Sequence, residues 1–100
     1  TLWVAIMTNA MAAEFVNPMT YDETQKDELI AFAREVAIKN YGLDKEPVVE
    51  FMTNKLVNAC IWLSKNGNDT ILLHQVIENW RDADGDYLMM KFEYEQKELK

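Results

Sequence analysis

The strongest constraint on the fold is the helical spacing of apolar residues in three consecutive segments between residues 22 and 80. The three apolar stripes are Leu29, Phe32, Ala33, Val36, Ala37 and Tyr41; then Val48, Val49, Met52, Leu56, Cys60 and Leu63; then Leu73, Val76, Ile77 and Trp80. Apolar residues at this spacing line one face of an α-helix. The sequence therefore predicts a mainly α protein, a small bundle of four to five helices.

Residues typical of helix ends bound each of the three segments. The expected helix starts are Thr20 or Asp22, Asp44, and Asn68 or Asp69. The expected stops are Gly42 and the pair Asn66-Gly67. Short polar side chains cap the first backbone N–H groups of a helix, and glycine suits the left-handed residue that ends one. Pro47 is compatible with the first turn of the second helix.

The two ends of the chain are less clearly patterned. Residues 2–16 hold twelve apolar positions, so a helix there needs burial in this chain or against a partner. Residues 2–7 also suit a short buried strand. From Tyr87 to Tyr94 the chain alternates as a strand does, yet Met, Lys, Glu and Leu favour helix. We expect a helix after a short extended start, with an α+β fold carrying short N- and C-terminal strands as the alternative.

Length and charge limit the classes of protein. One hundred residues suit a single domain over residues 1–100, and no apolar run approaches the length of a membrane span. Seventeen acidic against ten basic residues give a net charge of −7, which argues against direct binding to nucleic acid or to a membrane. Cys60 is the single cysteine, so no intrachain disulfide forms and a reducing, cytoplasmic setting is expected.

The sequence carries little catalytic machinery. His74 is the single histidine, and Cys60 falls on an apolar stripe where a thiol behaves as a small hydrophobe. The three glycines are scattered, so no phosphate-binding loop is present. We expect a protein that is not an enzyme and has no cofactor.

One segment has the spacing of a metal loop. Residues 82–93 read DADGDYLMMKFE, with Asp82, Asp84 and Asp86 at the first, third and fifth positions and Glu93 at the twelfth. This segment resembles the calcium loop of EF-hand proteins, and the resemblance implies that these four carboxylates bind calcium. Tyr87 stands where the family has glycine. A degenerate calcium-binding domain is therefore the alternative function, against an acidic turn at Asp84-Gly85.

The surplus of apolar residues favours a protein partner. Six methionines and eleven aromatic residues exceed the needs of a small helical core. The predicted partner-binding residues are Trp3, Met7, Met11, Asp82, Asp84 and Asp86. We interpret the chain as a small acidic, non-enzymatic protein–protein interaction module. Its partner is a second copy in a homo-oligomer, or a larger protein with a basic, nucleic-acid-binding surface that the module regulates or inhibits.

Overall fold

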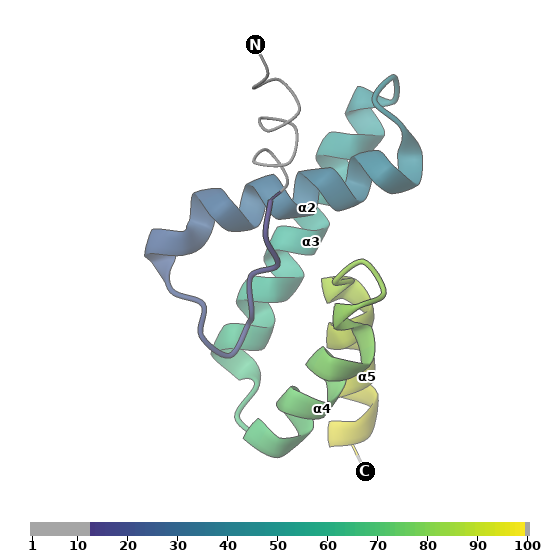
Figure 1. Ribbon diagram of the computed structural model, residues 1–100. Helices are drawn as coiled ribbons and strands as arrows, with labels where there is room; N and C mark the ends of the chain where they lie inside the picture. Colours follow the sequence, from purple (N-terminus) through teal and green to yellow (C-terminus); the bar gives the residue numbers. More distant parts are fainter. Residues whose placement is uncertain (1–12, 100) are drawn as a thin grey trace.

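Helix α3 (Glu46–Asn66) is the central element of the fold (Figure 1). In the computed structural model, which describes residues 13–99, α2 (Lys26–Tyr41) and α5 (Tyr87–Glu98) both pack against α3. Helix α4 (Thr70–Arg81) packs against α5, and the short 3-10 helix η1 (Glu23–Gln25) leads into α2. No strand occurs within residues 13–99, so the predicted mainly α bundle is confirmed.

Local caps explain where two of the helices begin. The Asp22 side chain accepts a hydrogen bond from the Thr24 N–H, and the Gln25 side chain accepts one from the Asp22 N–H. This reciprocal pair is a capping box. The Asp69 carboxylate accepts from the Leu72 N–H at 3.1 Å and starts α4. Asp69 therefore caps α4, as one of the two residues expected there. Asp22 caps η1, whereas α2 itself begins at Lys26 after Gln25, without a side-chain cap.

The start of α3 differs from the prediction. This helix begins at Glu46, after Lys45 and not directly after Asp44, and no side chain caps it. Pro47 lies in its first turn, where the missing N–H costs nothing. The expected glycine stop of α2 is correct, since Gly42 has a φ of 97°.

The C-terminal segment is helical from Tyr87 onward. The Asp86 carboxylate accepts hydrogen bonds from the N–H groups of Leu88 and Met89 at 3.1 and 3.2 Å, so the helix starts without an extended lead. The alternative C-terminal strand is wrong, because a helix places Tyr87, Met90 and Tyr94 on one fully buried face. The alternative strand over residues 2–7 lies outside the described residues.

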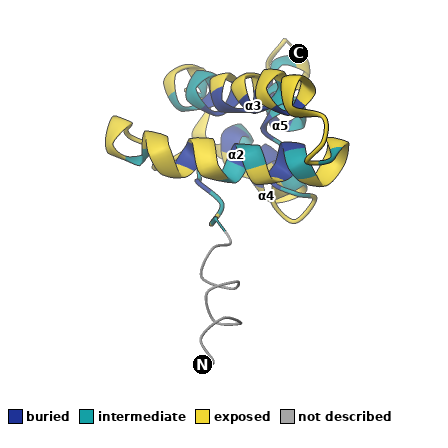
Figure 2. Cartoon of the chain, turned by 90° about the horizontal axis from the view of Figure 1, so that it is seen from above, coloured by how far each residue is buried: buried dark blue, intermediate teal, exposed yellow. Residues whose placement is uncertain are grey.

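The core forms where the inner faces of the helices meet (Figure 2). The predicted stripe residues that are buried are Leu29, Ala33, Val36, Ala37, Val49, Leu56, Cys60, Leu63, Leu73, Val76 and Ile77. Two stripe residues are exposed instead, Tyr41 at 44% and Val48 at 42%. Both lie at the closed end of the α2–α3 hairpin, which extends beyond α4 and α5 in Figure 1. Phe32, Met52 and Trp80 are partly buried.

No helix within residues 13–99 combines the length and the apolar character needed to cross a bilayer.

Candidate protein-binding site

Residues 13–18, which we call the strap, cross the bundle beside α2 and α5. The Tyr87 hydroxyl donates a hydrogen bond to the Val16 carbonyl at 2.6 Å and accepts one from the Val16 N–H at 3.1 Å. The Ala13 N–H donates to the Glu35 carboxylate at 2.8 Å. Val16 and Pro18 are buried. The strap is therefore held by both its backbone and its side chains.

Three aromatic rings meet where the strap crosses the bundle: Phe15 of the strap, Phe32 of α2 and Tyr87 of α5. The Phe15 ring stacks on Tyr87 with centroids 5.5 Å apart and meets the Phe32 ring edge to face at 5.6 Å. The Phe32 and Tyr87 rings are also edge to face, at 5.9 Å. Such pairs add to the stabilisation that burial gives. The guanidinium of Arg81 lies 5.0 Å from the centre of the Phe15 ring.

The turn between α4 and α5, residues 82–86, lies against these rings. Asp84 and Gly85 both have a left-handed backbone, with φ values of 65° and 56°. A Cβ at Gly85 would come within 2.8 Å of atoms in the Phe15 and Phe32 rings. The close approach of the turn to the rings therefore requires glycine. The Asp84 carboxylate also pairs with the Lys39 ammonium at 2.7 Å.

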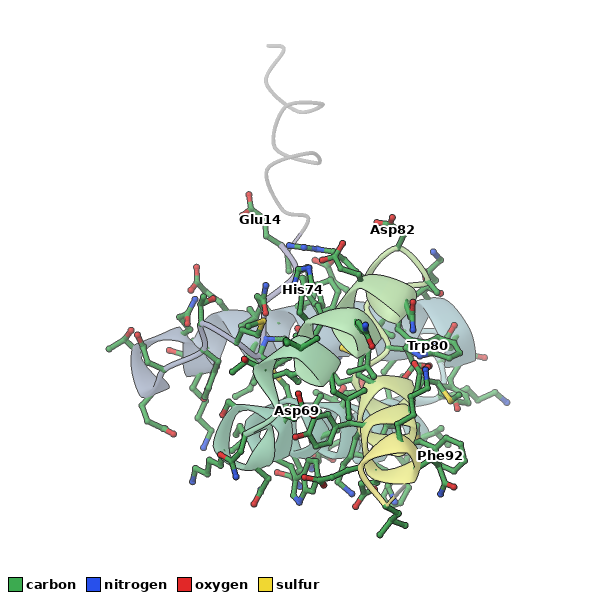
Figure 3. The ribbon with its side chains drawn as sticks, turned by 90° about the horizontal axis from the view of Figure 1, so that it is seen from below. Glu14, Asp69, His74, Trp80, Asp82 and Phe92 are labelled. Carbon is green, nitrogen blue, oxygen red and sulfur yellow. The ribbon has the colours of Figure 1, made fainter. Side chains whose placement is uncertain are left out.

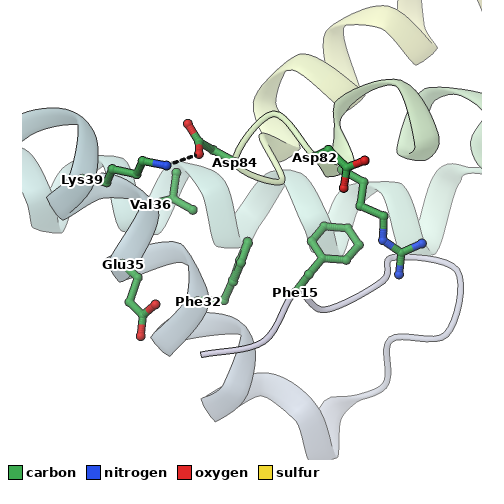
Figure 4. Close-up of a pocket in the computed structure, with 8 residues that line it drawn as sticks. Phe15, Phe32, Glu35, Val36, Lys39, Asp82 and Asp84 are labelled. Atoms are coloured by element: carbon green, nitrogen blue, oxygen red, sulfur yellow. Dashed lines mark hydrogen bonds and ion pairs between the residues drawn. The ribbon is translucent and has the colours of Figure 1, made fainter. Parts of the chain in front are cut away.

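A pocket of about 380 Å³ opens between α2, the strap and this turn (Figure 4). Its lining residues are Phe15, Phe32, Glu35, Val36, Lys39, Arg81, Asp82 and Asp84. In Figure 4 the two phenyl rings lie between Glu35 on one side and Asp82 on the other. Three carboxylates and two basic groups therefore surround an aromatic floor, which leaves the lining one negative charge in excess.

The structure brings together two of the six predicted partner-binding residues, Asp82 and Asp84. Asp86 has a separate role, because its carboxylate caps α5. The other three, Trp3, Met7 and Met11, lie outside the described residues. Sequence reasoning missed Phe15 and Glu35 as site residues, because no local pattern shows that they lie beside residues 82–84 in space.

The four carboxylates of the EF-hand-like segment do not converge. Glu93 lies on α5, where its carboxylate accepts from the Trp80 indole N–H at 2.8 Å and pairs with Lys97 at 2.7 Å. The hydrogen bond from Lys97, with those from Asn79 and Trp80, holds the pKa of Glu93 below its usual range. In Figure 3, Trp80 lies beside α5, whereas Asp82 projects into solvent at the end of α4.

The turn is also too short for a calcium loop. Because α5 begins at Tyr87, only five residues separate it from α4, whereas a calcium hand needs the second helix to begin near Met90. Within residues 13–99, no three His, Cys, Asp or Glu side chains come close enough to hold a metal ion. The calcium-loop interpretation therefore gains no support from this geometry.

The single histidine and the single cysteine lie in different environments. His74 is exposed on α4 (Figure 3). Cys60 is fully buried on α3, and burial raises the pKa of its thiol to about 12. The thiol is therefore protonated near neutral pH, the unreactive form.

Comparison with protein-family models, curated proteins and solved structures found no match to this chain. The fold and the site themselves define the class: a small α-helical bundle with an acidic, aromatic-floored pocket at the α4–α5 turn.

Proposed function

We propose that this chain is a non-enzymatic protein–protein interaction module whose pocket at the α4–α5 turn takes a basic side chain of a partner. The observation that carries the proposal is the placement of the Glu35, Asp82 and Asp84 carboxylates around two phenyl rings. Carboxylates form charge-assisted hydrogen bonds with basic side chains, and the faces of aromatic rings attract the same positively charged groups. Arg81, above Phe15, uses the same chemistry within the chain.

Arginine is the basic residue that suits this pocket best. A guanidinium is planar, so it can lie against an aromatic ring while its N–H groups reach a carboxylate in a bidentate pair. The Phe15 ring already contacts Tyr87 and Arg81, so Phe32 is the ring that an incoming guanidinium would meet. The Lys39–Asp84 pair at the rim is solvent-exposed, with 69% and 38% of the two side chains accessible. An exposed pair of this kind contributes at most about 1 kcal/mol, so an incoming cation displaces Lys39 at little cost.

The charge of the whole chain favours the same kind of partner. Five basic side chains within residues 13–99 already form ion pairs: Arg34, Lys39, Arg81, Lys91 and Lys97. The net charge of −7 steers the chain toward basic surfaces and away from nucleic acid itself. We propose that it regulates or inhibits a larger protein by covering a basic face, such as one that binds nucleic acid.

A matched pair of tripeptides tests the pocket directly. The capped peptide Gly-Arg-Gly and its citrulline analogue, which is uncharged and nearly isosteric, are titrated into the protein and followed by amide NMR. We expect the arginine peptide alone to shift the signals of Phe15, Phe32 and residues 82–85. Asp82→Asn is expected to weaken binding about fivefold, the loss of roughly 1 kcal/mol.

Glu50→Gln is the matched control, because it removes one exposed carboxylate from α3, whose residue 50 does not line the pocket. This variant should bind the arginine peptide as the wild type does. Equal shifts with the citrulline peptide, or shifts spread over the whole surface, would rule out the proposed pocket.

A further inference from the structure

A second groove, of opposite charge, lies between α3 and α5. Its volume is about 350 Å³ and its lining residues are Lys55, Asn58, Ala59, Trp62, Leu88 and Lys91. Two of these six carry positive charge and none is acidic, on a chain with seventeen acidic residues. This local reversal of the overall charge marks the groove as a separate surface from the pocket at the α4–α5 turn.

The groove combines an apolar floor with lysines at its edge. The Trp62 ring is fixed by an edge-to-face contact with Tyr94, with centroids 6.1 Å apart. The Lys91 ammonium lies 4.9 Å from the centre of the Trp62 ring and 3.3 Å from the Glu95 carboxylate. The Lys55 ammonium lies 5.3 Å from the centre of the Phe51 ring. Within residues 13–99 the Lys55 ammonium forms no ion pair, so it is available to a ligand, whereas at Lys91 a ligand carboxylate must replace or join Glu95. In both lysines the aliphatic stem covers apolar surface.

Two exposed phenylalanines extend the apolar surface of these helices. Phe51 on α3 is 59% exposed, and Phe92 on α5 is 56% exposed. Phe51 lies one turn before Lys55, and Phe92 one turn after Leu88. Figure 3 shows Phe92 projecting outward from α5. Large exposed apolar side chains beside a groove are typical of a protein-binding surface.

We propose that the α3–α5 groove binds an acidic amphipathic helix of a partner protein. Its apolar side chains fill the groove over Trp62 and Leu88, and its carboxylates pair with Lys55 and Lys91. Helices α3 and α5 pack against each other, and a third helix lying in the groove between them buries its apolar face. Charge complementarity selects an acidic helix over a basic one.

A second copy of this chain fits the groove less well than a different protein does. Two copies related by a twofold axis through the groove would bring Lys55 and Lys91 against their own counterparts, and like charges at an interface are unfavourable. A contact between the groove and an acidic surface elsewhere on another copy would be heterologous and would not close into a dimer.

The test selects peptides that bind the wild-type chain from a displayed random library. The peptides are about 15 residues long, enough for four helical turns. Bound peptides are sorted by loss of binding to Lys55→Glu or to Lys91→Glu. We expect the sorted peptides to combine Leu, Phe or Trp at helical spacing with Asp or Glu. A peptide sorted on one lysine reversal should also be weakened at least about tenfold by the other reversal in fluorescence anisotropy, because each turns attraction into repulsion.

Lys65→Glu is the matched control, with the same change of charge on the same helix at an exposed position that does not line the groove. It should change the affinity less than about twofold. Lys55 is the more informative position, because Lys91 also contacts Trp62 and Glu95 and its reversal needs a check of stability by thermal melt.

Three results would overturn the proposal. The selection could enrich no peptide whose binding depends on Lys55, or it could enrich basic or uncharged peptides. Lys65→Glu could also reduce the affinity for a sorted peptide as much as the groove variants do. Sedimentation of the wild-type chain that shows self-association abolished by Lys55→Glu would overturn it in favour of a second copy. Basic peptides whose binding requires Asp82 but not Lys55 bind the pocket at the α4–α5 turn. The two proposals can therefore be contradicted independently.

Discussion

Tyr87 is the residue on which most of the site depends. Its ring is one of the three in the aromatic cluster, and its hydroxyl makes both hydrogen bonds to the Val16 backbone. Burial raises the pKa of this hydroxyl far above its usual value, so it stays protonated and remains a donor. The residue stands where an EF-hand loop has glycine, and its bulk is needed here to hold the strap.

We expect Tyr87→Phe to lower the free energy of unfolding by about 2 kcal/mol. The change keeps the ring but leaves the buried N–H and C=O of Val16 without a partner, and each unsatisfied group costs roughly 1–3 kcal/mol if water does not enter. Urea unfolding measures the loss. Tyr41→Phe removes a hydroxyl from an exposed tyrosine and should change stability by less than about 0.5 kcal/mol. Equal stability of the two variants would contradict the assigned role.

At the scale of elements, the α4–α5 turn both joins two helices and forms one wall of the pocket. Its two left-handed residues reverse the chain within five positions, and the Asp86 carboxylate starts the next helix at once. The turn can lie on the aromatic rings only because Gly85 has no side chain.

We expect Gly85→Ala to destabilise the protein through both backbone strain and a steric clash. The left-handed φ of 56° costs an alanine about 1–2 kcal/mol. The added Cβ also meets two packed rings at 2.8 Å. The clash should add at least about 1 kcal/mol, measured by urea unfolding.

Gly85→Ala should also weaken the arginine peptide, because the turn must move away from Phe15 and Phe32 to admit the methyl group. Glu50→Gln, which lies outside the pocket, is again the control and should bind normally. If Gly85→Ala loses less than about 1 kcal/mol, the turn does not press on the rings as the structure indicates.

At the scale of the whole molecule, the excess negative charge is unevenly distributed. Carboxylates predominate at the α4–α5 pocket, while the α3–α5 groove carries two lysines and no acid in its lining. The two proposed partners therefore have opposite charge, and binding one need not exclude the other.

Because the carboxylates of the EF-hand-like segment lie apart, we expect calcium to leave the thermal stability of the protein unchanged. Glu93 is engaged by Trp80 and Lys97, and Asp86 caps α5, so neither is free to join Asp82. Thermal melts in excess calcium and in chelator should agree within about 2 °C. An intact site at a hundredfold excess over its Kd would add about 2.7 kcal/mol, a shift of on the order of 10 °C or more. A shift of that size would restore the calcium hypothesis.

The sequence by itself determined the helices of the middle of the chain. Their periodic apolar residues, the Asp69 cap of α4 and the Asp22 cap of η1 all depend on residues within a few positions of one another, so a local pattern predicts them. The sequence also predicts Asp82 and Asp84 to be partner-binding residues. Both line the pocket, and their binding to a partner stays a prediction.

Only the tertiary structure decided between strand and helix at Tyr87–Tyr94, because both patterns were present and burial against α3 and α4 selected the helix. It also decided that Tyr41 and Val48 are exposed and that Phe15, Phe32 and Gly85 meet. These residues are up to seventy positions apart in sequence. Contacts over such separations depend on how whole helices pack, and a local pattern carries no information about that.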